Sequence, residues 1–362
     1  MLGNELLYIV PAVITAFLIT YITIPVLQRG INALNVRISK NDSDSGIDTS
    51  TASAIGIFAS VLITFYLWGG SGAVHSYSYL VAAIFLFLLS EYNSSSFRMR
   101  WVNDLFFRVS AAAVLVMGAG ININDLGGLL GIGTVSYPVA VCISIAFILA
   151  FSHSLNHLDR GSGLSGGVVV IATGFMGIWF WMAGFLGFAI LSFIIAASMI
   201  GFLVYNINPD ELKLGATGSR AIGFVLGYLS LKFLVTNASV AGETIYLENG
   251  IVFVVSLMIV PIILSIMRLI NAFSQRIESG NHKIFDADKL VELGMEVHQV
   301  SFLLWSVNIF VVGLAYSTMM LEINVQFAIL FITGFALLYM MRTTAIYSER
   351  LFNSRAKLQK QE

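Results

Sequence analysis

Long apolar segments separated by short polar stretches dominate this chain. A helix that spans a membrane needs about 20 mostly apolar residues. Eleven segments approach or meet this length, and they lie at 5–27, 51–69, 77–91, 105–121, 135–155, 166–183, 185–205, 221–236, 250–268, 300–319 and 325–341. The weakest division is the one between the sixth and seventh, where only Ala183-Gly184 intervenes. The pattern predicts an all-α, polytopic integral membrane protein with about eleven transmembrane helices.

The positions of Lys and Arg test this division independently, because cytoplasmic loops are rich in both. All 19 basic residues except Arg108 and Lys232 follow odd-numbered spans, and those two lie near span ends, where we expect them to snorkel. The alternate loops contain no basic residue; they are 70–76, 122–134, 237–249 and 320–324. The distribution predicts an N-terminus outside and a C-terminus in the cytoplasm. Residues 1–341 then form one transmembrane domain, and 342–362 form a cytoplasmic tail.

Composition narrows the classes of partner. Hydrophobic residues make up 57% of the chain and charged residues 11%, against roughly 25% charged residues in soluble proteins. The net charge of -1 and the lack of a basic patch argue against nucleic acid as a partner and leave membrane lipids. A single cysteine, Cys142, excludes a disulfide or a cysteine-based metal site within one chain.

Two polar segments on the predicted cytoplasmic side carry recognisable motifs. Residues 156–167 read N-H-L-D-R-G-S-G-L-S-G-G, and residues 206–219 read N-I-N-P-D-E-L-K-L-G-A-T-G-S. They resemble the polyprenyl-phosphate N-acetylhexosamine-1-phosphate transferases, the WecA/MraY group of glycosyltransferase family 4. That family reads N-x-x-D-G-x-D-G-L in the first loop and about P-A-x-V-F-M-G-D-x-G-S in the second. The second motif aligns without a gap from Pro209 to Ser219.

The resemblance implies a multi-pass protein of the bacterial inner membrane that acts in envelope polysaccharide or glycolipid synthesis. Members of the family join a sugar-1-phosphate from a UDP-sugar to undecaprenyl phosphate with the help of Mg²⁺. Both substrates are anionic, so a divalent cation is needed to neutralise the diphosphate, and Mg²⁺ prefers carboxylate oxygens.

Several charged positions of the family pattern hold other residues here. Glu91-Tyr92 stands where the family has an adjacent Asp pair, and Ala216 replaces the Asp of G-D-x-G-S, which by resemblance is a magnesium ligand. The remaining departures are Arg160 in place of Gly, Ser162 or Gly163 in place of the second Asp, and Phe285, Ala287 and Asp288 in place of a histidine cluster. The turn-forming residues remain, namely Pro209, Gly215, Gly218, Ser219 and Gly223.

The resemblance leaves a short set of candidate site residues. Asp159 and Glu91 are the catalytic candidates, and Asp159 is also the candidate metal ligand. The candidate substrate-binding residues are Asn156, Arg220, Ser219, Lys213 and Arg100. Plainer explanations stand beside these. Asp159 fits a helix cap, Glu91 fits an interfacial charge, and topology alone explains the basic residues.

Three functions remain open. The first is a catalytically degenerate family member that binds a polyprenyl phosphate or serves as a regulatory partner, without any cofactor. The second is an active transferase with a remodelled Mg²⁺ site that uses Glu91, Asp159 and Asp210 or Asp286. The third is a transporter, which the near absence of ionisable residues in mid-span disfavours. The resemblance also predicts a homodimer or a heterodimer with an active relative.

Overall fold

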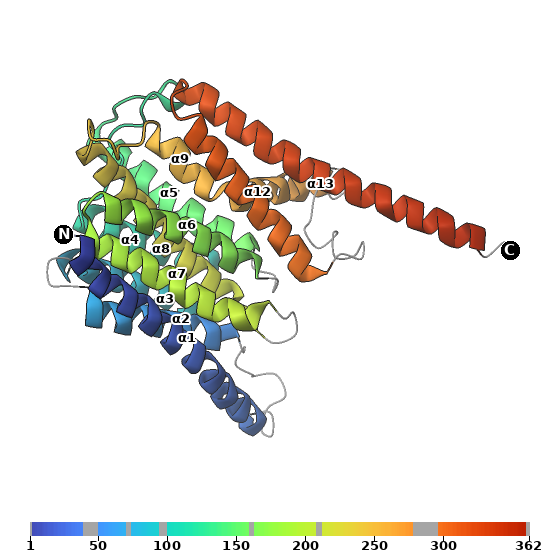
Figure 1. Ribbon diagram of the computed structural model, residues 1–362. Coiled ribbons are helices and arrows are strands. Elements are labelled where there is room, and N and C mark those ends of the chain that lie inside the picture. Colours follow the sequence, from blue (N-terminus) through green and yellow to red (C-terminus); the bar gives the residue numbers. More distant parts are fainter. Residues whose placement is uncertain are drawn as a thin grey trace.

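The structure, a computed structural model, describes residues 2–38, 50–69, 74–93, 100–158, 163–207, 212–277 and 296–359. Nearly all of these residues are helical, and the one extended pairing among them is an isolated bridge between Asp125 and Thr134. The helices lie side by side in one bundle, with the N-terminus at one end and α13 reaching beyond the other (Figure 1). The expected all-α architecture is confirmed.

Each apolar segment of the sequence contains a helix. The helices are α1 (Leu2–Ile38), α2 (Ser50–Trp68), α3 (Val74–Asn93), α4 (Arg100–Ala113) with a π-helical turn (Val114–Gly118), a 3-10 turn (Leu129–Gly131), α5 (Tyr137–Leu158), α6 (Leu164–Met182), α7 (Leu186–Asn206), α8 (Gly215–Ser239), α9 (Gly250–Leu257), α10 (Ile259–Ile277), α12 (Val297–Ser317) and α13 (Ile323–Gln359). The division between α6 and α7 is confirmed, because Gly184 turns the chain there with φ of +79°. The expected boundary at residue 341 is not a helix end, since α13 continues to Gln359.

The apolar content of the helices supports a polytopic membrane protein. Within the described residues, eight helices are long and apolar enough to span a bilayer, and α9 with α10 forms a ninth, bent candidate. α3 has a shorter apolar stretch, Tyr77–Leu88, and α4 has 14 residues. The count of eleven spans and the orientation therefore stay predictions.

The sequence pattern predicts one continuous span at 250–268. The structure instead has two helices there, α9 and α10, and the chain bends by 73° at Met258 between them. Pro261 explains the break, because it has no N–H to donate to the carbonyl of Leu257 four residues earlier. Asn308 of α12 donates its Nδ2 to that carbonyl at 3.1 Å. A side chain about 50 residues away thus satisfies the backbone group that the break exposes.

Helix α8 is the centre of the bundle, and most of its side chains are buried. It packs on α5, α2, α3, α6 and α9. Gly223 and Gly227 let α5 come close, since an added Cβ at either position would lie 2.8 Å from the α5 backbone, at Phe151 O or Ile148 Cα. Small residues four apart are the usual means by which membrane helices approach closely. The contact between α5 and α8 therefore has no room for a side chain.

We expect Gly223→Ala to destabilise the fold by about 1–3 kcal/mol, because the new methyl group would overlap backbone atoms that cannot move aside. The measurement is the thermal unfolding midpoint of the detergent-purified protein. Gly174→Ala in α6 is the matched control, since a Cβ there meets no atom within 4 Å. Equal midpoints for the two variants would contradict the close packing of α5 on α8.

Candidate functional site

The two polar motifs meet at the end of the bundle where α5 ends and α8 begins, which we call the site end. Gly163 comes directly before α6 and has a φ of +71°. Gly215 is the first residue of α8 and has a φ of +77°. Residues other than glycine rarely adopt these left-handed angles. The glycines of the motifs thus serve to turn the chain into the two helices that carry the candidate residues.

Ser219 and Asn156 join the two motifs directly. The Oγ of Ser219 lies 3.3 Å from Oδ1 of Asn156 and 2.8 Å from the carbonyl oxygen of Gly215. Ser219 is fully buried in the second turn of α8, and Asn156 is half-buried near the end of α5. In this arrangement the Ser219 hydroxyl positions α8 against α5 and faces the interior.

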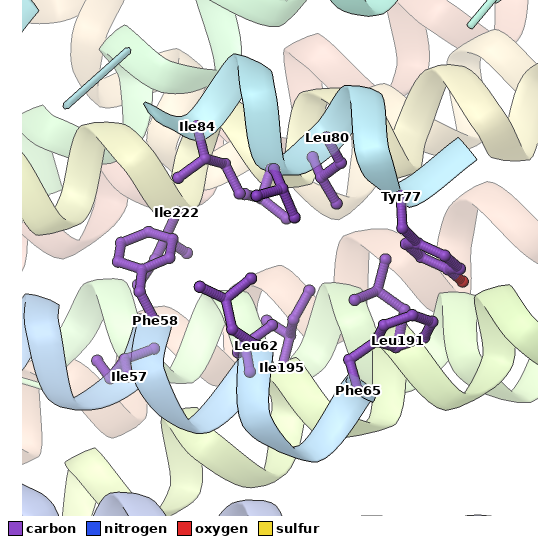
Figure 2. Close-up of a pocket in the computed structure, with 13 residues that line it drawn as sticks. Ile57, Phe58, Leu62, Phe65, Tyr77, Leu80, Ile84, Leu191, Ile195 and Ile222 are labelled. Atoms are coloured by element: carbon purple, nitrogen blue, oxygen red, sulfur yellow. The ribbon is translucent and has the colours of Figure 1, made fainter. Parts of the chain in front are cut away.

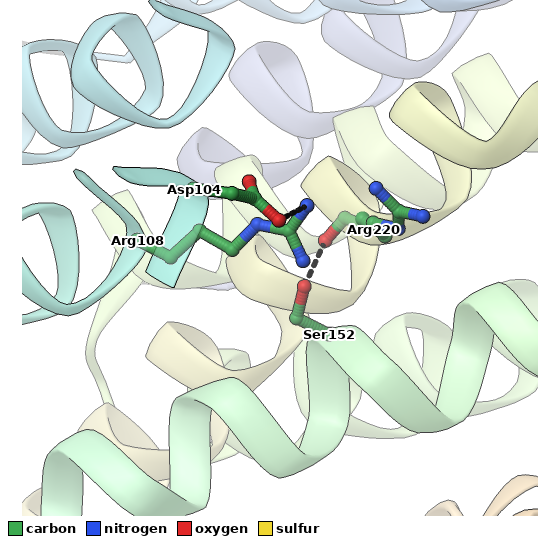
Figure 3. A network of polar contacts seen from close by, with 4 residues as sticks. All are labelled: Asp104, Arg108, Ser152 and Arg220. Atoms are coloured by element: carbon green, nitrogen blue, oxygen red, sulfur yellow. Dashed lines mark hydrogen bonds and ion pairs between the residues drawn. The ribbon is translucent and has the colours of Figure 1, made fainter. Parts of the chain in front are cut away.

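A second contact between the same helices lies about one turn further from the site end. Ser152 of α5 donates its hydroxyl to the backbone carbonyl of Arg220 at 2.8 Å, as Figure 3 shows. The Arg220 side chain is half-buried. His153 of α5 lies within electrostatic range of both Arg220 and Arg108, so α4, α5 and α8 bring these basic groups to one region.

Arg108 has a different environment from the one expected for a snorkelling residue. Its Nη2 is 2.8 Å from Oδ2 of Asp104, one turn earlier on α4, and the two side chains are 16% and 23% exposed. Its guanidinium also lies 5.6 Å from the centre of the Phe87 ring on α3. The ion pair and the ring hold Arg108 among α3, α4 and α5, and we call Arg108 and Arg220 the cation pair (Figure 3).

Lys232, the other basic residue within a span, lies towards the opposite end of α8. Its Nζ is 4.8 Å from the centre of the Phe188 ring near the start of α7, and the side chain is half-buried. Its cation–π contact is separate from the site end.

The remaining candidates are placed less completely. Lys213 is exposed just before α8, and Ala216 is exposed in its first turn. Glu91 lies in the last turn of α3 and Arg100 begins α4, but their side chains lie outside the described residues. The residues outside the description altogether are Asp159, Arg160, Asp210 and Asp286.

The described residues do not provide a magnesium site. No group of three or more His, Cys, Asp or Glu side chains in this part of the chain is arranged to hold a metal ion. The position at which the resemblance expects a carboxylate carries the exposed methyl group of Ala216, which has no lone pair to donate.

Two residues of the site end were not candidates on sequence grounds. Asp104 pairs with Arg108, and their spacing of four residues in a helix was the available signal. Asn206, buried at the end of α7, donates its Nδ2 to the carbonyl of Leu212, shortly before α8 begins at Gly215. No spacing rule in the sequence pattern pointed to this bond.

Comparisons with known proteins cover the same region. Residues 76–234, from α3 to α8, match glycosyl transferase family 4. A probable undecaprenyl-phosphate N-acetylglucosaminyl 1-phosphate transferase of Bacillus subtilis is 23% identical over 234 residues, 60% of this chain and 62% of that protein.

Shorter matches join two phospho-N-acetylmuramoyl-pentapeptide-transferases. The protein of Levilactobacillus brevis is 34% identical over 24% of this chain and 27% of its own. A Listeria monocytogenes protein is 32% identical over 32% of this chain and 33% of its own. The chain thus spans about three fifths of the Bacillus relative and a third or less of the other two.

The family match includes both motifs and the helices that join them, and the relatives are named as an undecaprenyl-phosphate N-acetylglucosaminyl 1-phosphate transferase and as phospho-N-acetylmuramoyl-pentapeptide-transferases. The part of the chain from α3 to α8 is therefore similar to the WecA/MraY-like members of glycosyl transferase family 4.

Proposed function

We propose that this protein binds a polyprenyl phosphate at the site end of the bundle without carrying out the transfer reaction of its family. Ala216 is the observation that carries the proposal. Its methyl group is exposed in the first turn of α8, where the family pattern has a metal-binding carboxylate. The surrounding framework joins α5 to α8 through Ser219 with Asn156 and through Ser152 with the Arg220 carbonyl.

The cation pair supports the binding of a phosphate. Guanidinium groups bind phosphate oxygens through paired hydrogen bonds and keep their charge at every physiological pH. Arg220 is half-buried at the start of α8, and Asp104 fixes the orientation of Arg108. Two positive groups on helices that both pack on α5 would offset the charge that a metal ion neutralises in the active relatives, and Lys213 would add a third at the surface.

For the setting, we propose eleven crossings of the bacterial inner membrane with the N-terminus outside, residues 1–341 as the membrane domain and 342–362 as a cytoplasmic tail. The segregation of Lys and Arg supports this orientation. The two termini at opposite ends of the bundle agree with an odd number of crossings (Figure 1). We also propose that the protein forms a homodimer, or a heterodimer with an active relative. In that form it would have a regulatory or assembly role in envelope polysaccharide synthesis.

We expect the purified protein to release no UMP from UDP-N-acetylglucosamine in the presence of undecaprenyl phosphate and Mg²⁺. The loss of a single metal ligand commonly lowers such rates by orders of magnitude. The Bacillus subtilis relative serves as the positive control. Turnover that disappears in Asp159→Asn would show an active transferase with a remodelled site and would overturn the proposal.

The substitution Ala216→Asp restores the carboxylate of the family pattern. We expect this variant to gain Mg²⁺ binding, measured by calorimetry, because a hard oxygen donor returns to the first turn of α8. Ala216→Asn is the control, since its size is similar but it lacks the charge. A wild-type protein that already binds Mg²⁺ as tightly as Ala216→Asp would count against the degenerate site.

We expect Arg220→Ala to weaken the binding of undecaprenyl phosphate by about tenfold or more, because a charge-assisted hydrogen bond is worth about 1.5–3 kcal/mol. Binding is measured by thermophoresis in detergent, with EDTA present to exclude a metal bridge. Arg220→Lys keeps the charge and should retain part of the affinity.

Lys232→Met is the matched control, because it removes a cation from the opposite end of the same helix. Equal losses in Arg220→Ala and Lys232→Met would indicate a general effect of charge. No loss in Arg220→Ala, with the variant folded, would rule out the cation pair as the phosphate site.

A further inference from the structure

Two adjoining cavities run along α2 on the side of α8 that faces away from the cation pair. The long cavity lies among α2, α3, α7 and α8, and its lining is entirely apolar. The mouth cavity lies between the first turns of α2 and α8 and the end of α3. Phe58 and Leu62 line both, so the two cavities adjoin at these side chains.

The long cavity exists because α2 and α3 each pack on α8 and stay apart from one another along most of their length. Figure 2 shows the space between them, with Phe58 at one end and Tyr77 with Phe65 at the other. The rings of Phe65 and Tyr77 close that end, with centroids 3.8 Å apart. The hydroxyl of Tyr77 donates to the carbonyl of Gly187 at 2.7 Å.

The cavity reaches the outer surface of the bundle between α2 and α3. Two of its lining residues, Leu62 of α2 and Val81 of α3, are 42% and 45% exposed. In a membrane protein this surface faces hydrocarbon. Water in an apolar cavity would find no hydrogen-bond partner, and an empty cavity would lack dispersion contacts for its lining side chains. A hydrocarbon chain is therefore the occupant with the matching chemistry.

The mouth cavity has a polar rim at the site end. Ser50, Thr51 and Thr217 bring hydroxyl groups to its lining, and no charged side chain of the described residues is among them. The lining residues of the two cavities on α2 extend from Ser50 to Phe65, which is a length of about 22 Å at 1.5 Å per residue. One leaflet contributes about 15 Å of hydrocarbon. The combined length therefore matches one acyl chain together with its ester region.

We propose that these cavities hold one acyl chain of a bilayer phospholipid, with the ester and glycerol oxygens at the hydroxyls of the mouth cavity. A polyprenyl phosphate fits these cavities less well, because its phosphate is stabilised by cations. The cation pair lies on the α4 and α5 side of α8, away from the cavities. The bound chain packs against Leu214, just before α8, and against Gly218 in its first turn, and so supports the helix that carries the candidate site. This inference does not depend on the proposed function.

The test uses the full chain in vesicles of phosphatidylethanolamine and phosphatidylglycerol that contain a phosphatidylethanolamine with a diazirine on its acyl chain. After irradiation, mass spectrometry of peptides locates the labelled residues. We expect labels to concentrate on the lining residues of α2 and α3. We expect Leu62→Trp to lower this labelling by about tenfold, equivalent to about 1.4 kcal/mol, because the indole fills the junction of the cavities.

Ile63→Trp is the matched control, since Ile63 is similarly exposed on α2 and lines neither cavity. Val81→Trp, paired with Phe85→Trp, repeats the test from α3 if Leu62→Trp does not fold. Labels spread evenly over the surface, or equal labelling in Leu62→Trp and Ile63→Trp, would overturn the proposal. Displacement of the label by undecaprenyl phosphate but not by added phospholipid would overturn the choice of occupant. The Arg220→Ala protein should label normally, which separates this outcome from that of the proposed function.

Discussion

The close contact between α5 and α8 sets the geometry of the rest of the bundle. Gly223 and Gly227 leave no room for a Cβ against the α5 backbone, so the two helices meet at one register. In a bilayer the hydrophobic effect does not drive helices together, and close packing of this kind drives their association instead. Because α8 also contacts α2, α3, α6 and α9, its position against α5 determines where those helices can lie.

The same contact explains why the site end keeps its shape while its chemistry differs from the family pattern. Ser152 and Ser219 make their bonds to backbone or amide groups across the α5–α8 interface, and neither bond involves a metal or a charge. Replacing a carboxylate by the methyl group of Ala216, which is exposed, leaves those bonds intact. The contacts that join α5 to α8 thus do not require a carboxylate at position 216.

The sequence predicts the helices well and their tertiary partners poorly. Hydropathy located every α-helix of the described residues, because a bilayer demands long apolar stretches. The bend at Met258 was not predicted, although Pro261 was visible in the sequence. The Leu257 carbonyl that the bend exposes accepts a hydrogen bond from Asn308 of another helix, and hydropathy does not reveal such a contact. At the site, the motifs supplied Asn156 and Ser219 as candidates, and the structure brings these two side chains within 3.3 Å of each other, while their role in substrate binding stays a prediction. The partner of Arg108 was missed because hydropathy alone assigned the residue to the membrane surface, whereas the fold buries it beside Asp104.

Helix α8 separates two environments that a lipid needs in different parts of its structure. Its face towards α5 and α4 gathers guanidinium groups, where a phosphate gains charge-assisted hydrogen bonds. Its face towards α2 and α3 borders an apolar cavity, where such a phosphate would lose its hydration without any cation in return. A phosphate head and an uncharged acyl chain therefore favour opposite faces of one helix. Both would bear on its first turns, so occupancy of the apolar face stabilises the segment that presents Arg220.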